Sequence, residues 1–203
     1  MAFTNNSIEL IGRAVDGPVY SHSIYGEAFF RMFFAVRRLS GTEDRLPVTV
    51  SERLLGCFPP DPEPRFRISG QIRSYNQRTE TGSRLIITVF AREFEPAVGD
   101  EPDMNEADVT GFICKQPIFR TTPFSREIAD VLIAVNRRFG KSDYLPAIAW
   151  GRNARFLSEL PVGTNLHVPG RLQSREYRKI LPDGTETVRT AYELSCSAVE
   201  PLD

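Results

Sequence analysis

The sequence is poor in the residues from which metal sites and disulfide frameworks are built. Its 203 residues include only three cysteines and two histidines. No two cysteines stand in a CxxC spacing, and neither histidine lies near a cysteine along the chain. We therefore expect no zinc site, no disulfide scaffold and no bound cofactor.

Catalytic sequence motifs are missing as well. The chain contains no GxSxG, no Walker loop, no HExxH and no GxGxxG after an expected strand. These patterns place nucleophiles, phosphate-binding amides or metal ligands at fixed positions, so their absence removes several large enzyme classes. We expect a protein that is not an enzyme.

Long apolar runs are absent too. Runs such as 33–36 and 131–135 are the longest uninterrupted ones, whereas a membrane-spanning helix needs about eighteen residues or more. Nothing at the start of the chain has the pattern of a signal peptide. The sequence predicts a cytoplasmic protein without a membrane partner.

The basic residues are almost all arginines. Of 25 basic residues only Lys115, Lys141 and Lys179 are lysines, which leaves 22 arginines, although the net charge is −1. Residues 97–106 hold four acids and no base, so residues 1–96 carry +1 and residues 107–203 carry +2. Arginine both pairs with phosphate and stacks on flat rings, so each half has the cation that a nucleic-acid partner needs.

The chain repeats itself. Residues 6–47 align without a gap with residues 105–146, and the match resumes after a one-residue insertion, for example at Gly70 and Gly170. The aligned stretch holds ten identities, among them Asn6/Asn105, Gly12/Gly111, Arg38/Arg137 and Asp44/Asp143. We expect a first domain over 1–96, an acidic linker over 97–106 and a second domain over 107–203 with the same fold.

Each half has the pattern of several antiparallel strands. In the second half, alternating apolar runs predict strands near 108–117, 127–138, 143–150, 165–177 and 187–199, and helical spacing predicts a helix over 153–160. Five strands with one short helix between the third and fourth are typical of an oligonucleotide-binding (OB) barrel. The predicted fold is all-β, with two tandem five-stranded OB-fold barrels, each with a short helix between its third and fourth strands.

Alternation along two strands predicts which side chains face out. Leu145, Ala147 and Ala149 align with the apolar set Leu46, Val48 and Val50 and should line the core, so Tyr144 and Trp150 should point outwards. Along the next strand the outward set is Arg171, Gln173, Arg175 and Tyr177. Exposed rings beside cations suit single-stranded nucleic acid, but a subunit contact would also use an exposed aromatic patch.

The second half resembles the bacterial single-stranded DNA-binding proteins. The matching stretches are Gly111 with Pro117, residues 133–137, residues 143–154, Leu160 with Gly163, and residues 168–175. The resemblance implies that bases stack on Phe139, Tyr144, Trp150 and Tyr177. It implies phosphate contacts for nearby cations, which are Arg137, Arg138, Arg152, Arg171, Arg175 and Lys179.

The first half departs from this family pattern. The positions aligned with the four rings are Ser40, Arg45, Ser51 and Gln77. It keeps candidates for contact with the strand in Arg37, Arg38, Arg45, Arg73, Tyr75 and Arg78. Phe29 and Phe33 are expected to face outwards, where they would stack bases or, as we favour, pack against a partner barrel.

The expected function is sequence-independent binding and protection of single-stranded DNA in replication, recombination or repair. The family commonly assembles four barrels, so a two-barrel chain suggests a homodimer. The family's acidic, partner-recruiting tail is not expected here, because the sequence stops at residues 201–203. Two alternatives stay open: a primosome-like assembly module built from OB barrels, and a binder of single-stranded RNA.

Overall fold

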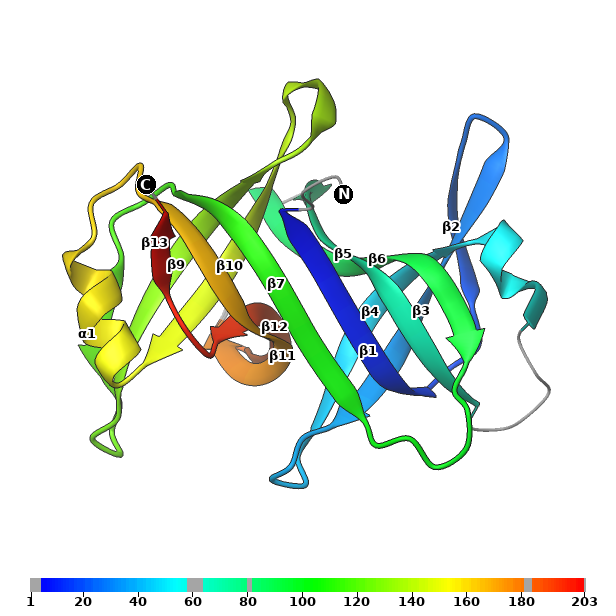
Figure 1. Ribbon diagram of the computed structural model, residues 1–203, viewed down its shortest axis with the longest axis horizontal. Helices are drawn as coiled ribbons and strands as arrows, with labels where there is room; N and C mark the ends of the chain where they lie inside the picture. Colours follow the sequence, from blue (N-terminus) through cyan, green and yellow to red (C-terminus); the bar gives the residue numbers. More distant parts are fainter. Residues whose placement is uncertain (1–4, 58–63, 80–81, 181–183, 203) are drawn as a thin grey trace.

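The computed structural model describes residues 5–57, 64–79, 82–180 and 184–202 (Figure 1). The first half contains β1 (Asn6–Ala14), β2 (Val19–Ile24), β3 (Glu27–Arg37), β4 (Glu43–Ser51), β5 (Arg65–Thr79) and β6 (Gly82–Pro96). The second contains β7 (Met104–Ile113), β8 (Ile118–Thr121), β9 (Glu127–Asn136), β10 (Ser142–Trp150), β11 (Asn165–Ile180), β12 (Glu186–Cys196) and β13 (Glu200–Leu202). One α-helix, α1 (Arg152–Glu159), lies between β10 and β11, and 3₁₀ turns cover Glu52–Cys57 and Arg138–Gly140.

Strand pairing closes a ring of five strands in each half. In the first half β1, β3, β4, β6 and β5 pair in turn, and β5 returns to β1. In the second half β7, β9, β10, β12 and β11 repeat this order, and β11 returns to β7. The predicted all-β fold of two OB barrels is confirmed, and β2, β8 and β13 are additions to the two rings.

Two details of the prediction are wrong. β7 begins at Met104, so the last three residues of the expected linker lie in a strand, where they pair with β1. The first half has a 3₁₀ turn, Glu52–Cys57, where a short helix was expected. Gly56 interrupts that segment, and glycine does not sustain an α-helix. The division of the chain into two independent domains stays a prediction.

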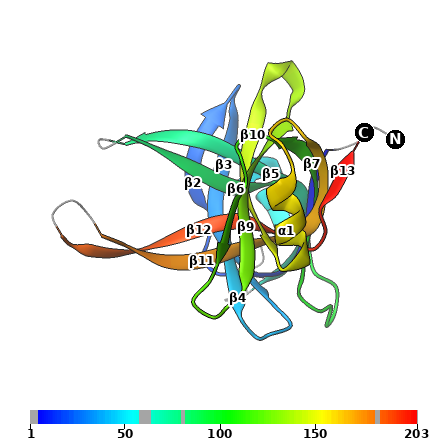
Figure 2. The same ribbon diagram turned by 90° about the vertical axis from the view of Figure 1, so that its left-hand side faces the viewer.

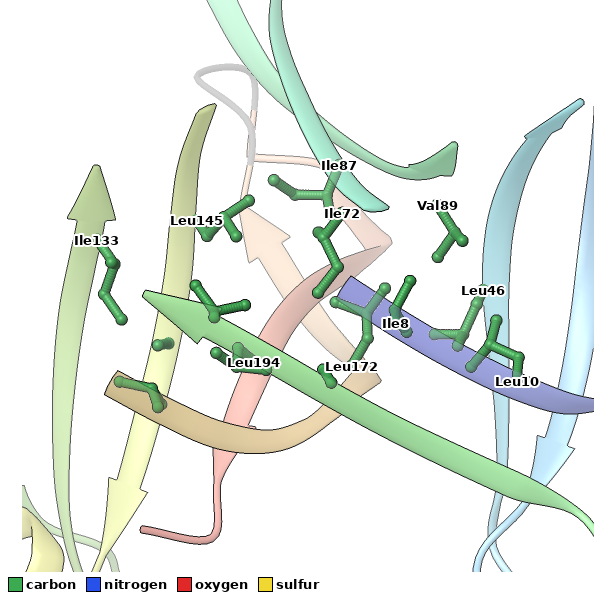
Figure 3. Close-up of a cluster of buried hydrophobic side chains, with 14 of the residues drawn as sticks. Ile8, Leu10, Leu46, Ile72, Ile87, Val89, Ile133, Leu145, Leu172 and Leu194 are labelled. Carbon is green, nitrogen blue, oxygen red and sulfur yellow. The ribbon is translucent and has the colours of Figure 1, made fainter. Parts of the chain in front are cut away.

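The two barrels share one sheet and one apolar core. β1 and β7 pair antiparallel over six residues of each strand, from Asn6↔Val109 to Ile11↔Met104. The buried side chains of both halves form one cluster, in which Ile72 and Ile87 of the first half lie between Val89 and Leu145 (Figure 3). Apolar burial stabilises such a core by roughly 25 cal/mol per Å². The halves are therefore packed against each other.

A pseudo-twofold set of polar contacts joins the halves. The Ser74 N–H donates to Asp143 Oδ1 at 2.7 Å, and the Tyr144 N–H donates to Ser74 Oγ at 2.6 Å. In the related contact, the Ser174 N–H donates to Asp44 Oδ1 at 2.7 Å. The repeat aligns Ser74 with Ser174 and Asp44 with Asp143, so each serine contacts the aspartate of the other half.

Long hairpins reach out from both barrels. The β5–β6 and β11–β12 hairpins project towards the same side of the molecule, while the β3–β4 and β9–β10 loops extend in opposite directions (Figure 2). No helix among the described residues is long and apolar enough to cross a membrane. The hairpin side of the molecule carries several of the predicted site residues.

Candidate nucleic-acid interface

All four rings expected to stack bases reach the surface. The exposed fractions are 97% for Phe139, 43% for Tyr144, 39% for Trp150 and 37% for Tyr177. Tyr144 and Trp150 lie near the two ends of β10, and Tyr177 lies on the β11–β12 hairpin. The core set Leu145, Ala147 and Ala149 is buried as expected, so the inferred alternation of β10 is confirmed.

Phe139 is held outwards by an uncommon backbone conformation. Its φ and ψ are 64° and 34°, in the left-handed region, and Gly140 follows with φ 66°. Such a conformation costs a residue with a side chain on the order of 1 kcal/mol or more. The loop therefore spends conformational energy on a fully exposed ring, an arrangement often associated with ligand contact.

Trp150 lies on the edge of a cationic cleft. The cleft has a volume of about 480 Å³, and its lining includes Arg126, Arg171 and Arg175 of the second half and Arg38 of the first. Arg171 Nε is buried and has no hydrogen-bond partner within the described part of the chain. A flat indole beside several guanidinium groups suits a base and its flanking phosphates.

Tyr177 also has a cation beside it. The Arg175 guanidinium lies 5.9 Å from the centroid of the Tyr177 ring, within the distance of a cation–π contact. Both residues lie in the exposed C-terminal part of β11. The hairpin thus extends the aromatic and cationic surface beyond the Trp150 cleft.

The six predicted phosphate ligands of the second half fall into two groups. Among the described residues, Arg138, Arg152, Arg171 and Lys179 have no carboxylate partner. Arg137 lies 3.5 Å from Asp143, and Arg175 lies 3.4 Å from Glu193. No described carboxylate neutralises the cations of the first group, so their charge is available to a phosphate.

Gln173 was expected on the outer face with Arg171 and Arg175, and this was wrong. Gln173 is buried, and its Nε2 donates to Glu193 Oε1 at 2.9 Å. Arg38 of the first half lies over this part of β11 and reaches the Ser174 carbonyl oxygen at 3.5 Å. The neighbouring barrel covers the position, which alternation within one strand does not reveal.

Two first-half arginines bind buried carboxylates at the junction. Arg73 Nη1 lies 2.9 Å from Asp143 Oδ2, and Arg38 Nη2 lies 2.6 Å from Asp44 Oδ1. The hydrogen bond that Arg38 donates to Asp44 raises the pKa of Arg38 above its ordinary value. These contacts give both side chains a structural partner, while Arg37 and Arg78 are exposed.

The first barrel has rings at other positions than the second. Phe33 is exposed, and the Arg45 guanidinium lies 5.6 Å from its centroid. Tyr75 is exposed on β5. Phe29, expected outside, is only 8% exposed, because His22 of β2 stacks on it at 5.2 Å. The prediction for Phe29 was wrong because His22, opposite it in the β2–β3 ladder, and Phe90 pack against its ring.

Sequence reasoning missed several cations near these surfaces. Arg126 precedes β9 and reaches the Trp150 cleft because β9 and β10 pair with Trp150 opposite Ile128. Arg92 and Lys141 line a further cleft between the halves. Their positions depend on how neighbouring β-strands pair and on how the two halves meet. The alternation of residues along one β-strand therefore does not predict them.

Comparison with known proteins gives a family match over the second half. The profile of the Single-strand binding protein family matches residues 104–202. "Single-stranded DNA-binding protein 2" of Chlorobaculum tepidum is 30% identical over 112 residues, which cover 50% of this chain and 73% of that protein. "Single-stranded DNA-binding protein 1" of Staphylococcus aureus is 31% identical over 107 residues. The chain spans 62% of the length of this Staphylococcus relative.

A solved structure matches both halves. The wild-type single-stranded DNA binding protein from Thermus aquaticus superposes with a TM-score of 0.75 at 21% sequence identity. The match covers 98% of this chain and 93% of that one. At this identity the likeness establishes the fold, including its second barrel, and leaves the site to be argued from its own residues.

Proposed function

Since this chain belongs to the single-strand binding protein family, we propose that it binds single-stranded DNA independently of sequence and without catalysing a reaction. Such binding would protect exposed strands during replication, recombination or repair. The observation that carries the proposal is the Trp150 cleft, where an exposed indole lies beside guanidinium groups from both halves.

The proposed interface combines stacking with charge. Bases stack on Trp150, Tyr144, Tyr177 and Phe139, each contact contributing about 1–3 kcal/mol. Stacking uses the flat face that every base has, so it discriminates little between sequences. Arg138, Arg152, Arg171 and Lys179 contact phosphates, and binding should therefore weaken as salt rises.

We propose further that two copies of the chain associate into a homodimer with four barrels. The support is the barrel count of the chain together with the exposed apolar side chains of the first half, such as Tyr20 and Ile24 of β2. Light scattering at micromolar concentration should give twice the mass of the 22.9 kDa chain. A monomer mass would remove this part of the proposal.

Titration with poly(dT), followed by tryptophan fluorescence, tests the main proposal, because Trp150 is the only tryptophan. We expect strong quenching that saturates at a fixed ratio of nucleotides to protein. Trp150→Ala should weaken binding, measured by the anisotropy of labelled oligo(dT), by about 1–3 kcal/mol, or roughly fivefold to 150-fold. Tyr25→Ala is a matched control, since Tyr25 is an exposed ring at the distant β2–β3 turn.

The other two functions give different results in the same assay. An assembly module would neither retain poly(dT) at low salt nor change its tryptophan emission. A binder of RNA would lose labelled oligo(dT) to oligo(U) more readily than to unlabelled oligo(dT). Competition by the two matched oligomers therefore separates DNA from RNA preference.

A further inference from the structure

A larger cleft lies where the β5–β6 hairpin of the first barrel meets the β9–β10 loop of the second. We call it the junction cleft. Its volume is about 940 Å³. Its lining residues are Asn5, Asn6, Gln71, Arg73, Arg92, Asn136, Arg137, Arg138, Phe139 and Lys141, so both halves contribute equally.

The junction cleft holds an excess of positive charge. Of its five cations, Arg73 and Arg137 share the buried carboxylate of Asp143. Arg92, Arg138 and Lys141 have no acidic partner in any described part of the chain. An anion in this cleft would meet three cations that no carboxylate neutralises.

Arg92 is directed by a local irregularity of the sheet. Along the β5–β6 ladder Ser69 pairs with Glu93 and Gly70 pairs with Ala91, so Arg92 is the extra residue of a β-bulge. In the second barrel the β11–β12 ladder ends at the corresponding Gly170, and β11 pairs next with β13, where His167 lies opposite Glu200. Bulges are enriched beside binding sites, where they re-aim a side chain.

The wall of the junction cleft formed by the β9–β10 loop is anchored. Asn5 Nδ2 donates to the Asn136 carbonyl oxygen at 2.7 Å, which links the start of the first half to this loop. Phe139 stands fully exposed at the cleft with its left-handed backbone. A base ring could therefore stack beside phosphates held in the cleft.

The pseudo-twofold axis relates this cleft to a second location, around the β3–β4 loop, which differs in charge. Two adjoining hollows there measure about 390 Å³ each. Both include Arg37, Arg38, Leu39 and Asp103 in their lining, and one of them also includes Arg171. Asp103 accepts the Arg37 N–H at 2.7 Å and pairs with Arg65 at 2.8 Å. The acidic segment between the halves thus places a counter-ion at this location.

The residues that give the junction cleft its character are replaced at the related location. In the repeat alignment Ser40 stands opposite Phe139, Leu39 opposite Arg138 and Thr42 opposite Lys141. The ring and two of the three unpaired cations are therefore missing there. The two locations share an architecture but not a chemistry.

We propose that single-stranded nucleic acid crosses between the barrels through the junction cleft, with its phosphates on Arg92, Arg138 and Lys141 and a base on Phe139. The related location carries no such crossing, since it lacks the ring and two of the three unpaired cations. The strand then follows one asymmetric route over a pseudosymmetric molecule. This inference rests on the proposed function and adds a route and two ligands, Arg92 and Lys141, to it.

The test compares the salt dependence of poly(dT) binding between the wild type and two double variants. For a single strand, the slope of log K against log salt becomes shallower by about 0.7 for every phosphate that the protein no longer neutralises. Arg92→Ala with Lys141→Ala should reduce it by about 1.4 and shorten the occluded length, while Trp150 quenching persists. Arg13→Ala with Arg65→Ala, an equal charge change at the related location, should leave the slope unchanged.

Photo-cross-linking gives a second readout from aligned positions. Benzoylphenylalanine in place of Lys141 should cross-link to oligo(dT), and the same group in place of Thr42 should not. Equal slopes for the wild type and the Arg92/Lys141 variant, equal reductions in both double variants, or cross-links from both positions would each overturn the route. A wild type that fails to bind poly(dT) at all would instead remove the proposed function.

Discussion

Asp44 and Asp143 are the residues on which the junction depends most directly. Each is almost fully buried, and each accepts a backbone N–H from a serine of the other half. Each also pairs with an arginine. A buried carboxylate is tolerated only when such partners replace its lost hydration, so these aspartates report on correct docking of the halves.

Asp143→Ala should lower the free energy of unfolding by about 3–5 kcal/mol, because Arg73, Arg137 and the Ser74 N–H would lose their common buried partner. Urea denaturation measures the change. Glu186→Ala is the control, since Glu186 forms an exposed ion pair with Arg178 that should contribute less than about 1 kcal/mol. Similar effects of the two variants would contradict the structural role of Asp143.

Glycines shared by the two halves mark places where strands approach closely. A Cβ built on Gly170 would lie 2.2 Å from the Ser195 carbonyl oxygen. Gly170→Ala should therefore force a backbone shift and cost about 1–3 kcal/mol. Gly17→Ala adds a methyl group in open space and should change stability by about 0.5 kcal/mol or less. Thermal unfolding of both variants tests this difference, and a stable Gly170 variant would be unexpected.

The sequence predicted single side chains well where one strand decides their environment. Alternation placed Tyr144 and Trp150 outside and Leu145 inside, as the structure has them. It was wrong for Phe29 and Gln173, because rings of paired strands and the other barrel cover those positions. Burial by a neighbouring element depends on tertiary packing, which a period of two does not encode.

Strands and helices were predictable where their pattern is long. The helix expected at 153–160 occurs as α1 at Arg152–Glu159, and the main strands of the second half occur within a few residues of expectation. β8 was not predicted, because its four residues are all exposed and show no alternation. β13 was not predicted for a related reason, since it has only three residues and all are exposed.

β13 is attached to the second barrel partly through His167. Its Nδ1 lies 2.8 Å from Glu200 of β13, and its Nε2 lies 2.9 Å from Asp108 of β7. Hydrogen bonds to these two carboxylates raise the pKa of His167 above its ordinary value of 6.5. The protonated ring donates to both carboxylates and so links β7, β11 and β13.

This contact should make β13 weaker as pH rises. A raised pKa in the folded state stabilises the protein fully below pH 6.5, and the contribution is lost as pH rises through the folded value above 6.5. We expect hydrogen exchange of the His167 and β13 amides to quicken more between pH 6 and pH 8 than base catalysis alone explains. His167→Gln should remove this excess, and an unchanged excess would assign it to another group.

At the scale of the whole molecule, the repeat predicted two like barrels but not how they meet. The alignment gives equivalent residues, whereas the β1–β7 pairing and the exchange between Ser74 and Asp143 become visible only in three dimensions. For the same reason Arg92 and Lys141 escaped prediction, since their cleft exists only when the halves are docked. Two barrels of the same fold therefore form a junction in which, among the described residues, only one of the two related locations, the junction cleft, has this excess of unpaired cations.

The pseudosymmetry makes a prediction about the second half expressed alone. A fragment of residues 104–203 keeps the closed ring of β7, β9, β10, β12 and β11 but exposes the edge of β7 that pairs with β1. An unpaired strand edge is a template for another strand, and a second copy of β7 is the segment most similar to β1. The fragment should form dimers through β7–β7 pairing, which sedimentation at several concentrations would measure. A wild-type fragment that stays monomeric would mean that β1–β7 pairing requires residues that differ between the two strands.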